Sequence, residues 1–193
     1  MDSLPTTRDR IVQAAMELFW RKGYGSTSIA DILETAKVNS GSLYYFFKGK
    51  QELLVAVLEA YRDGIDAMLL EPSWGEVEDP VEKVFALLAT YRRLLAETDC
   101  FYGCPIGSLA LELHEPDPEI RELIAANFAA WTEAVRGCLE ETGLKDGTDT
   151  QALAELVLTV MEGAVMQTRT YRDIGHYDRA VEQLRNYLGC LRQ

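Results

Sequence analysis

Several kinds of segment are missing from this sequence, and each absence excludes a class of protein. No uninterrupted apolar run reaches the roughly 18 residues that a membrane-spanning helix needs. The opening from Met1 to Arg8 has neither the basic nor the apolar segment of a secretory signal peptide. Four cysteines in 193 residues are too few for a disulfide scaffold. We therefore expect free thiols, a cytoplasmic location and no membrane partner.

Recognisable catalytic and metal-binding patterns are also absent. We find no Ser-His-Asp or Cys-His-Asp spacing and no glycine-rich phosphate loop after a strand. Cys100 and Cys104 have the spacing of half a metal site, but Cys138 and Cys190 are isolated and the chain has two histidines. The sequence therefore predicts a protein that is not an enzyme, with no cofactor and no metal. Two alternatives stay open: a small helical thiol enzyme using Cys104 and His114, and a helical protein-interaction module.

Charge of one sign is in excess, and its placement is uneven. The net charge is −12, and 48% hydrophobic with 26% charged residues is ordinary globular composition. Residues 1–52 carry seven basic and six acidic side chains, a net charge of +1, whereas residues 53–193 carry twelve and twenty-five, a net charge of −13. Because an acidic bulk repels polyanions, the distribution excludes a nonspecific nucleic-acid coat protein. It permits a small nucleic-acid-binding region, here called the reading head, within residues 1–52.

Apolar residues recur with helical period along nearly the whole chain, and the period-2 pattern of strands is nearly absent. A capping box at Thr6 and Asp9 begins the first helix, and Gly23 ends it. Further helices are expected at 28–36, 40–46, 50–70, 80–97, 106–113, 118–143, 148–173 and 177–191, with a long loop in the stretch 71–80. The sequence therefore predicts an all-α fold of about nine helices.

Residues 28–46 are typical of a helix-turn-helix: two short helices, joined by a turn of three or four residues, that pack on the longer first helix. In that arrangement the second short helix enters the major groove of DNA. Small side chains in its first turn allow close approach, and its free N–H groups attract phosphate. The residues that we expect at the DNA surface are Ser40, Gly41 and Ser42, followed by Tyr44, Tyr45, Lys48 and Lys50. The alternative is that the aromatic residues are core and the lysines are solvated.

A long pattern runs through residues 23–53. It reads Gly23-x3-Thr27-Ser28-Ile29-x2-Ile32-x3-Ala36-x-Val38-x-Ser40-Gly41-x-Leu43-Tyr44-x-Phe46-x3-Lys50-x2-Leu53. This pattern resembles the DNA-binding domain of the TetR/AcrR family of bacterial transcriptional regulators. The rest of the chain resembles the family in layout, and residues 103–113 resemble a segment of one subgroup. The resemblance implies a helix-turn-helix domain at 1–49 and a larger helical ligand-binding and dimerisation domain at 50–193.

The same resemblance implies a function. It implies a homodimeric repressor whose two recognition helices read a near-palindromic operator in double-stranded DNA, with activation as the open alternative. A small-molecule effector then shifts the separation of those helices and releases the DNA. By position, Thr27 and Ser28 cap the second helix and contact phosphate. Tyr44 matches the family's DNA-contacting tyrosine, and Lys50 matches its lysine at the start of the fourth helix.

Three positions depart from the family pattern. Lys37 stands where glycine is usual, so a left-handed turn there costs about 1 kcal/mol relative to glycine. Tyr45 stands where histidine is common, which keeps a hydrogen-bonding tip but loses titration near neutral pH. Leu33 replaces a common alanine and requires slightly different packing. The first two departures affect the operator sequence and the affinity for it.

Aromatic and methionine residues of the later helices predict a largely apolar effector pocket. Its expected lining is Tyr61, Phe85, Tyr91, Tyr102, Cys104, Leu109, Phe128, Trp131, Met161 and Met166. The alternative for each is a plain core position. Polar candidates for selecting the ligand are Glu112, His114, Gln167 and Arg169.

A redox- or electrophile-sensing switch at Cys100 or Cys104 is the alternative input. Cys104 directly precedes the expected helix start at Pro105. A thiol near a helix start has its thiolate form favoured. Buried, inert cysteine is the third possibility.

The last two helices are expected to form the dimer interface. Helix 148–173 is apolar nearly all round, so one face can meet its own core and another face a partner. The small residues Gly163 and Ala164 permit close approach. The full set of interface candidates is Leu156, Val160, Gly163, Ala164, Gln167, Leu184 and Leu188.

Overall fold

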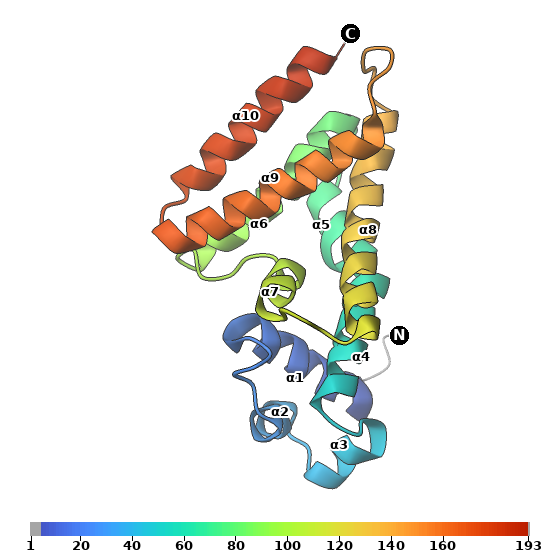
Figure 1. Cartoon of the computed structure of the whole chain (residues 1–193), viewed down its shortest axis with the longest axis vertical. Coiled ribbons are helices and arrows are strands. Elements are labelled where there is room, and N and C mark those ends of the chain that lie inside the picture. The colour runs from blue at the N-terminus through green and yellow to red at the C-terminus, as the bar shows by residue number, and fades with distance from the viewer. Residues whose placement is uncertain (1–4, 193) are drawn as a thin grey trace. The chain divides into compact units, whose positions relative to one another are not determined.

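The computed structural model describes residues 5–192, so the stretch Met1 to Leu4, on which part of the signal-peptide prediction depends, lies outside it. The described residues form ten α-helices and one π-helical segment, with no β-strand (Figure 1). In chain order the elements are α1 (Thr7–Lys22), α2 (Ile29–Ala36), α3 (Ser40–Phe46), α4 (Lys50–Asp63), the π-helical segment η1 (Asp66–Leu70), α5 (Glu71–Trp74), α6 (Pro80–Glu97), α7 (Pro105–Glu112), α8 (Pro118–Glu140), α9 (Thr150–Tyr171) and α10 (Gly175–Leu191). The all-α prediction is confirmed.

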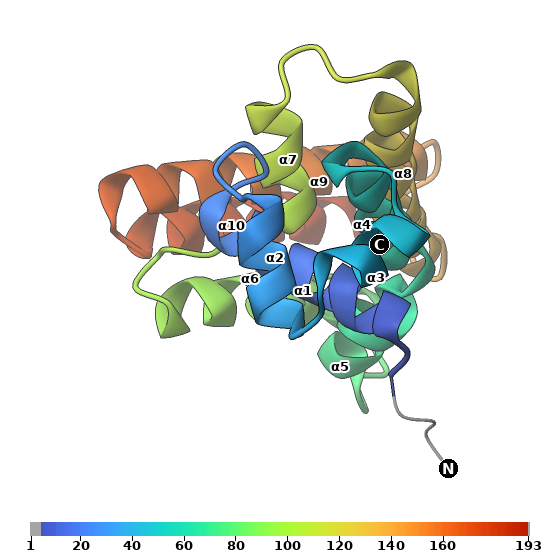
Figure 2. The ribbon, with the colours of Figure 1, turned by 90° about the horizontal axis from the view of Figure 1, so that it is seen from below.

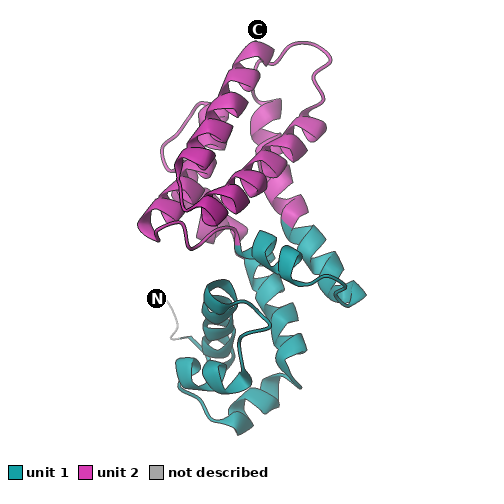
Figure 3. Ribbon diagram, turned by 60° about the vertical axis from the view of Figure 1, so that its left-hand side comes forward, with its two compact units in different colours: residues 1–63, 105–127 teal, residues 64–104, 128–193 magenta. Residues whose placement is uncertain are grey.

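The helices gather into two compact units (Figure 3). Of the described residues, unit 1 takes 5–63 and 105–127, and unit 2 takes 64–104 and 128–192. Unit 1 extends beyond the expected N-terminal domain because α4 and α7 both pack against α1. Helix α8 contributes its first part to unit 1 and the remainder to unit 2.

Helix α1 is the centre of unit 1, and α2, α3, α4 and α7 all contact it (Figures 1 and 2). Its buried face is Ile11, Val12, Ala14, Ala15, Leu18 and Phe19. The other helices and the end of α3 supply Ile32, Leu43, Phe47, Leu53 and Leu54 to the same core. Each large aliphatic or aromatic side chain buried here contributes roughly 1.5–3 kcal/mol. The positions of α2 and α3 therefore depend on α1.

Unit 2 is a helical bundle in which α9 and α10 pack side by side and both contact α6 (Figure 1). Its fully buried side chains include Leu87, Leu88, Leu95, Leu139, Val157, Met161 and Tyr177. Ion pairs fasten α10 to α6 at the surface: Arg92 binds Asp178 through two nitrogens, at 2.6 and 2.9 Å. Exposed pairs of this kind add little each, so the apolar core provides most of the cohesion.

The helix starts follow the local signals in the sequence. The capping box predicted at Thr6 with Asp9 is present, and Ser28, which was expected to cap the second helix, forms a second box with Asp31. Gly23 ends α1 with a φ of 85°. The helix expected to begin at Thr148 begins two residues later, at Thr150, because Asp149 caps it by accepting the backbone N–H of Ala152 at 3.0 Å.

The segment 50–80 differs from the expected long helix followed by a loop. Helix α4 ends at Asp63, a π-helical turn follows, and the expected loop contains the one-turn helix α5. Tertiary contacts hold α5 in place: the Trp74 indole N–H donates to the carbonyl of Lys83 at 3.1 Å, and the Ser73 and Thr90 hydroxyls are 2.8 Å apart. Proline is tolerated in a first helical turn, so Pro72 does not prevent it. The predicted total of about nine helices is thereby corrected to ten α-helices in the described chain.

Candidate functional site

Helix α3 presents an exposed aromatic face in its second half and small exposed residues in its first turn. Asn39 caps the helix, since its Oδ1 accepts the backbone N–H of Ser42 at 2.8 Å and the Ser42 hydroxyl at 3.1 Å. Leu43 is fully buried and anchors the helix. Tyr44 and Tyr45 are 56% and 82% exposed, so they are not core residues. With Ser40 and Gly41, which are also exposed, they form a continuous set of groups available to a nucleic acid.

The turn between α2 and α3 is built around Lys37, which adopts the left-handed conformation with φ 54° and ψ 49°. The Lys37 N–H donates to the carbonyl of Glu34 at 3.2 Å, and the Val38 N–H donates to the carbonyl of Leu33 at 3.1 Å. These two bonds form a Schellman motif, in which glycine is the preferred residue at the left-handed position. The condition stated from the sequence, a left-handed Lys37, is therefore met.

Thr27 and Ser28 have different roles. Thr27 is 1% exposed, and its hydroxyl donates to the carbonyl of Gly23 at 2.7 Å. Its side chain is therefore turned into unit 1 and does not lie on the surface expected to face phosphate. Ser28 is exposed and caps α2 with Asp31. The Ser28 N–H and hydroxyl, followed by Lys22, lower the pKa of the Asp31 carboxyl to about 2.

The two lysines after α3 are also placed differently. The Lys48 side chain is 92% exposed and pairs with Glu52 at 3.1 Å. The Lys50 ammonium points into unit 1, where it donates to the carbonyls of Tyr24 at 2.9 Å and Thr27 at 3.0 Å. Lys50 therefore stabilises the turn between α1 and α2, and its contact with DNA stays a prediction.

A residue with no predicted role in the DNA-binding head also reaches that turn. Glu112, at the end of α7, accepts the backbone N–H of Tyr24 at 2.9 Å and of Gly25 at 2.6 Å. The sequence suggested Glu112 only as a group that selects a ligand. Its contacts span 87 and 88 residues of chain, and no local pattern reveals them.

Unit 2 contains a cluster of buried polar groups, centred on Tyr91. Burial raises the pKa of the Tyr91 hydroxyl well above its usual range, with further contributions from Cys104, Glu162 and Tyr177. Burial also raises the pKa of Glu162, partly offset by a hydrogen bond with Cys104. We call Tyr91, Cys104, Trp131, Glu162 and Tyr177 the buried polar cluster.

Two atoms of the buried polar cluster are incompletely satisfied within the described chain. Glu162 Oε1 is buried with no hydrogen-bond partner among residues 5–192. Trp131 Nε1 interacts with the Tyr91 hydroxyl but does not reach full hydrogen-bond geometry. Tyr177, in contrast, donates to the carbonyl of Leu88 at 2.8 Å. Because buried polar groups are normally paired, these two atoms distinguish the cluster from the apolar core around it.

The predicted pocket residues do not all gather there. Phe85, Tyr91, Cys104, Trp131 and Met161 are buried in unit 2. Tyr102 and Phe128 are half-buried in unit 2, whereas Tyr61 and Leu109 belong to unit 1. Met166 is 51% exposed and is therefore a surface residue of α9.

The predicted dimer residues are likewise of three kinds: buried, half-buried and exposed. Ala164, Leu184 and Leu188 are at most 3% exposed in the single chain, so their side chains belong to the core of unit 2. Val160 and Gly163 are half-buried. Leu156 is 38% exposed, and Gln167 is exposed. The surface of α9 and α10 also exposes Met166 and Tyr187, which the sequence did not place in the interface.

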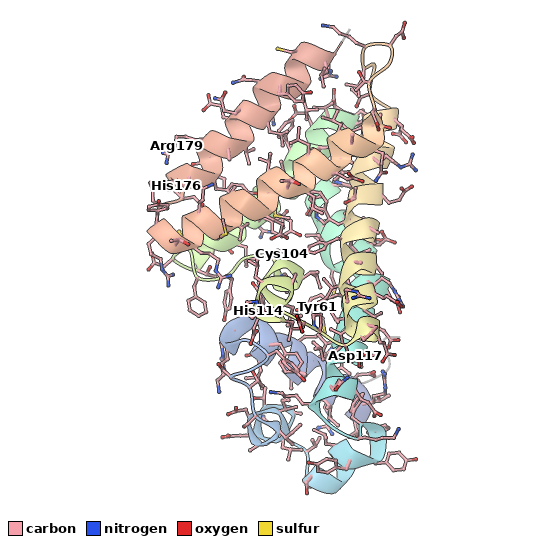
Figure 4. All side chains as sticks on the ribbon, in the orientation of Figure 1. Tyr61, Cys104, His114, Asp117, His176 and Arg179 are labelled. Carbon is pink, nitrogen blue, oxygen red and sulfur yellow. The ribbon has the colours of Figure 1, made fainter. Side chains whose placement is uncertain are left out.

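The cysteines form no disulfide within the described chain: Cys100, Cys104 and Cys138 are buried thiols, and Cys190 is exposed. Figure 4 shows Cys104 before α7 and His114 after it. An eight-residue helix spans about 12 Å, so the helix itself keeps this thiol and imidazole at opposite ends. That placement disfavours the thiol-enzyme alternative. No helix in the described chain is long and apolar enough to cross a membrane.

Family comparisons match two regions of the chain. Residues 11–57 match the family described as "Bacterial regulatory proteins, tetR family". Residues 80–183 match "Transcriptional regulator LmrA/YxaF-like, C-terminal domain". The two matches correspond to the helix-turn-helix region and to most of the later helices.

Individual proteins are similar over nearly the full length. The uncharacterized HTH-type transcriptional regulator Rv0196 of Mycobacterium tuberculosis is 31% identical over 186 residues, covering 94% of this chain and 93% of that protein. The HTH-type transcriptional repressor DhaR of Mycobacterium sp. is 24% identical, covering 86% of this chain and 84% of that protein. The crystal structure of a TetR transcriptional regulator from Chloroflexus aurantiacus has a TM-score of 0.80 at 28% identity, covering 95% of this chain and 94% of that one.

Proposed function

Because the chain belongs to the TetR family of bacterial transcriptional regulators, we propose that it acts as a homodimeric repressor that a small-molecule effector releases from a palindromic operator. The exposed Tyr44–Tyr45 face of α3 is the observation that carries this proposal. Both tyrosines lie in the last turn of a helix that Asn39 caps at its other end, and two adjacent exposed tyrosines offer rings and hydroxyls that suit a binding surface. The site of action is the cytoplasm, where bacterial operator DNA lies.

DNA is the partner that fits this face best. The N-terminus of α3 offers free N–H groups to phosphate, and Ser40 and Gly41 there are small and exposed. Lys48 is exposed just beyond the helix. The later residues, 53–193, carry a net charge of −13 and repel DNA, which restricts binding to this head.

Dimerisation through α9 and α10 presents two such heads to one duplex. Leu156, Met166 and Tyr187 are 38%, 51% and 49% exposed in the single chain, and a second copy related by a two-fold axis would cover them. A symmetric dimer reads half-sites about 34–36 Å apart, or a multiple of that distance, so the operator is expected to be a near-palindrome.

The effector binds in unit 2, at the buried polar cluster. Phe85 and Met161 are apolar and buried in the same unit, and an apolar interior suits a largely apolar molecule. Glu162 Oε1 and Trp131 Nε1 are buried without full hydrogen-bond partners. The effector is therefore expected to carry at least one group that donates a hydrogen bond to Glu162.

A thiol-based input is a second candidate, favoured by the position of two buried cysteines on one short connection. Cys100 and Cys104 are both buried between α6 and α7. Asp99 and Cys100 are consecutive left-handed residues, with φ of 51° and 57°, so this connection is under backbone strain. Oxidation of either thiol would alter the segment that leads into α7.

Selection of bound sequences from a random DNA library, at a fixed and stated salt concentration, tests the proposal. Enrichment of a near-palindrome is expected. Tyr44→Phe removes one hydroxyl and should weaken binding roughly three- to ten-fold. Tyr171→Phe is the matched control, because Tyr171 is an exposed tyrosine of α9 in unit 2.

The outcomes separate the alternatives. Failure to enrich any sequence would reject the regulator proposal and favour the interaction-module alternative. Unchanged binding by Tyr44→Phe would reject the assignment of α3 as the reading surface. Loss of binding after treatment with a thiol oxidant, prevented by Cys104→Ser, would favour the thiol input over a reversible ligand.

A further inference from the structure

The turn between α1 and α2 is held by a carboxylate on its N–H side. Both oxygens of Glu112 accept consecutive backbone N–H groups, Oε2 from Tyr24 at 2.9 Å and Oε1 from Gly25 at 2.6 Å. Successive N–H groups of this kind form an anion-binding nest. A Cβ at Gly23 or at Gly25 would lie 3.0 Å from one of these oxygens, so both glycines make room for the carboxylate.

A lysine holds the same turn on its carbonyl side. Lys50 Nζ donates to the carbonyls of Tyr24 and Thr27 and lies 4.3 Å from the centre of the Tyr24 ring. The ring itself packs edge-on against Phe19 of α1, with centroids 5.2 Å apart. The Glu112 carboxylate of α7 therefore binds backbone N–H groups of the turn, and the Lys50 ammonium of α4 binds carbonyls of the same turn.

The position of this turn determines the position of the helix-turn-helix. Thr27 closes the turn by bonding back to Gly23, and Ser28, the next residue, caps α2. A displaced turn therefore displaces the start of α2, and α3 follows through the Schellman turn at Lys37.

We call the contacts of Glu112 and Lys50 with the α1–α2 turn the clamp. Helix α7 connects the clamp to the later part of the sequence. It begins at Pro105, the residue after Cys104, and Cys104 belongs to the buried polar cluster. Glu112 is the last residue of the same helix. A shift of α7 along its axis would thus be transmitted to the turn through two backbone hydrogen bonds.

We propose that Glu112 is a positioning residue for operator recognition, which ties the α1–α2 turn to α7 and gives movements of α7 a path to α3 distinct from the Lys50 contact of α4. This inference rests on the proposed DNA-binding function. Glu112 does not contact DNA in this role and acts through the turn.

The test compares Glu112→Gln with Glu115→Gln. Both variants remove one negative charge from the same end of α7, but only Glu112 binds the turn; Glu115 is exposed. Removing a negative charge favours DNA binding electrostatically, so charge alone predicts equal or tighter binding in both variants. The clamp predicts that Glu112→Gln binds the selected operator about five-fold more weakly, because the amide can accept only one of the two N–H groups.

Hydrogen exchange supplies a readout inside the turn. The amides of Tyr24 and Gly25 should exchange faster in Glu112→Gln than in the wild type, whereas amides of α9 and α10 should be unchanged. The full-length chain is used throughout, and matching far-ultraviolet circular dichroism checks that the variants are folded.

Gly25→Ala is a second variant that leaves Glu112 in place. Its Cβ would lie 3.0 Å from Glu112 Oε1, so the carboxylate would have to shift away from the turn although the glutamate itself is unchanged. If both changes act on one contact, Gly25→Ala should weaken operator binding in the wild type and have little further effect in Glu112→Gln.

The possible outcomes are distinguishable. Operator affinity at or above the wild-type level in Glu112→Gln, with or without faster exchange, overturns the inference and leaves the regulator function intact. Equal losses in Glu112→Gln and Glu115→Gln also overturn it, because they show an effect unrelated to the turn. A wild-type chain that selects no operator rejects the proposed function, and this inference with it.

Discussion

Lys37 offers a direct test of backbone strain in the turn before the recognition helix. The residue has a φ of 54° in a left-handed position just after α2, and its side chain is exposed. Lys37→Gly retains the backbone N–H that binds the carbonyl of Glu34 and removes the Cβ. The substitution should therefore stabilise the chain.

The expected magnitude is the difference between two opposing effects. The left-handed region costs a residue with a Cβ about 1–2 kcal/mol. Glycine loses about 0.5–1 kcal/mol more conformational freedom than alanine on folding. Lys37→Gly should therefore raise the free energy of unfolding by about 0.5–1 kcal/mol, which in a chain of this size raises the melting temperature by about 1–4 °C.

Urea unfolding followed by circular dichroism measures this change, with Lys37→Ala as the matched control. The alanine variant loses the same charge but keeps the Cβ and its strain. We expect stabilisation in Lys37→Gly and none in Lys37→Ala. Equal stabilisation in both variants, or a loss in Lys37→Gly, would refute the strain argument.

Three further predictions concern buried or paired groups. Lys50→Met should destabilise the chain by about 1–2 kcal/mol in urea unfolding, because the Tyr24 and Thr27 carbonyls lose a charged donor. The control Lys48→Met, at a side chain that is 92% exposed, should have almost no effect. Equal effects in both variants would contradict the inward role of Lys50. Tyr177→Phe removes the 2.8 Å bond to the carbonyl of Leu88 and should reduce the free energy of unfolding by about 1 kcal/mol; an unchanged melting curve would show that this bond adds nothing. Burial raises the pKa of Glu162, so the stability that this group contributes is complete below its unfolded pKa and is lost as the pH rises through the higher folded pKa. Glu162→Gln should therefore have a higher free energy of unfolding than the wild type at pH 7, by about 1.4 kcal/mol for each unit by which folding raises the pKa. The difference should shrink as the pH falls towards 4.5, the ordinary pKa of the group. A difference independent of pH would refute the burial argument.

The sequence determined the helices wherever the signal was local. Thr6 with Asp9 and Ser28 with Asp31 each lie three residues apart, so each capping box is formed entirely within one helical turn. The apolar series of α1 likewise reports its buried face directly. The helix-turn-helix and the exposed face of α3 follow from such local patterns, because one short helix cannot bury all of its rings.

Only the tertiary structure decided where contacts between distant residues occur. Helix α5 was missed because its support comes from Lys83 and Thr90, not from its own four residues. The hydrogen bonds of Lys50 and those of Glu112 with Tyr24 and Gly25 join residues 23 to 88 positions apart. A side chain's charge and type are fixed by the sequence, but which backbone groups it meets depends on how the helices pack. For this protein, the sequence determined the reading head, and the packing of α4 and α7 against α1 decided what holds that head in position.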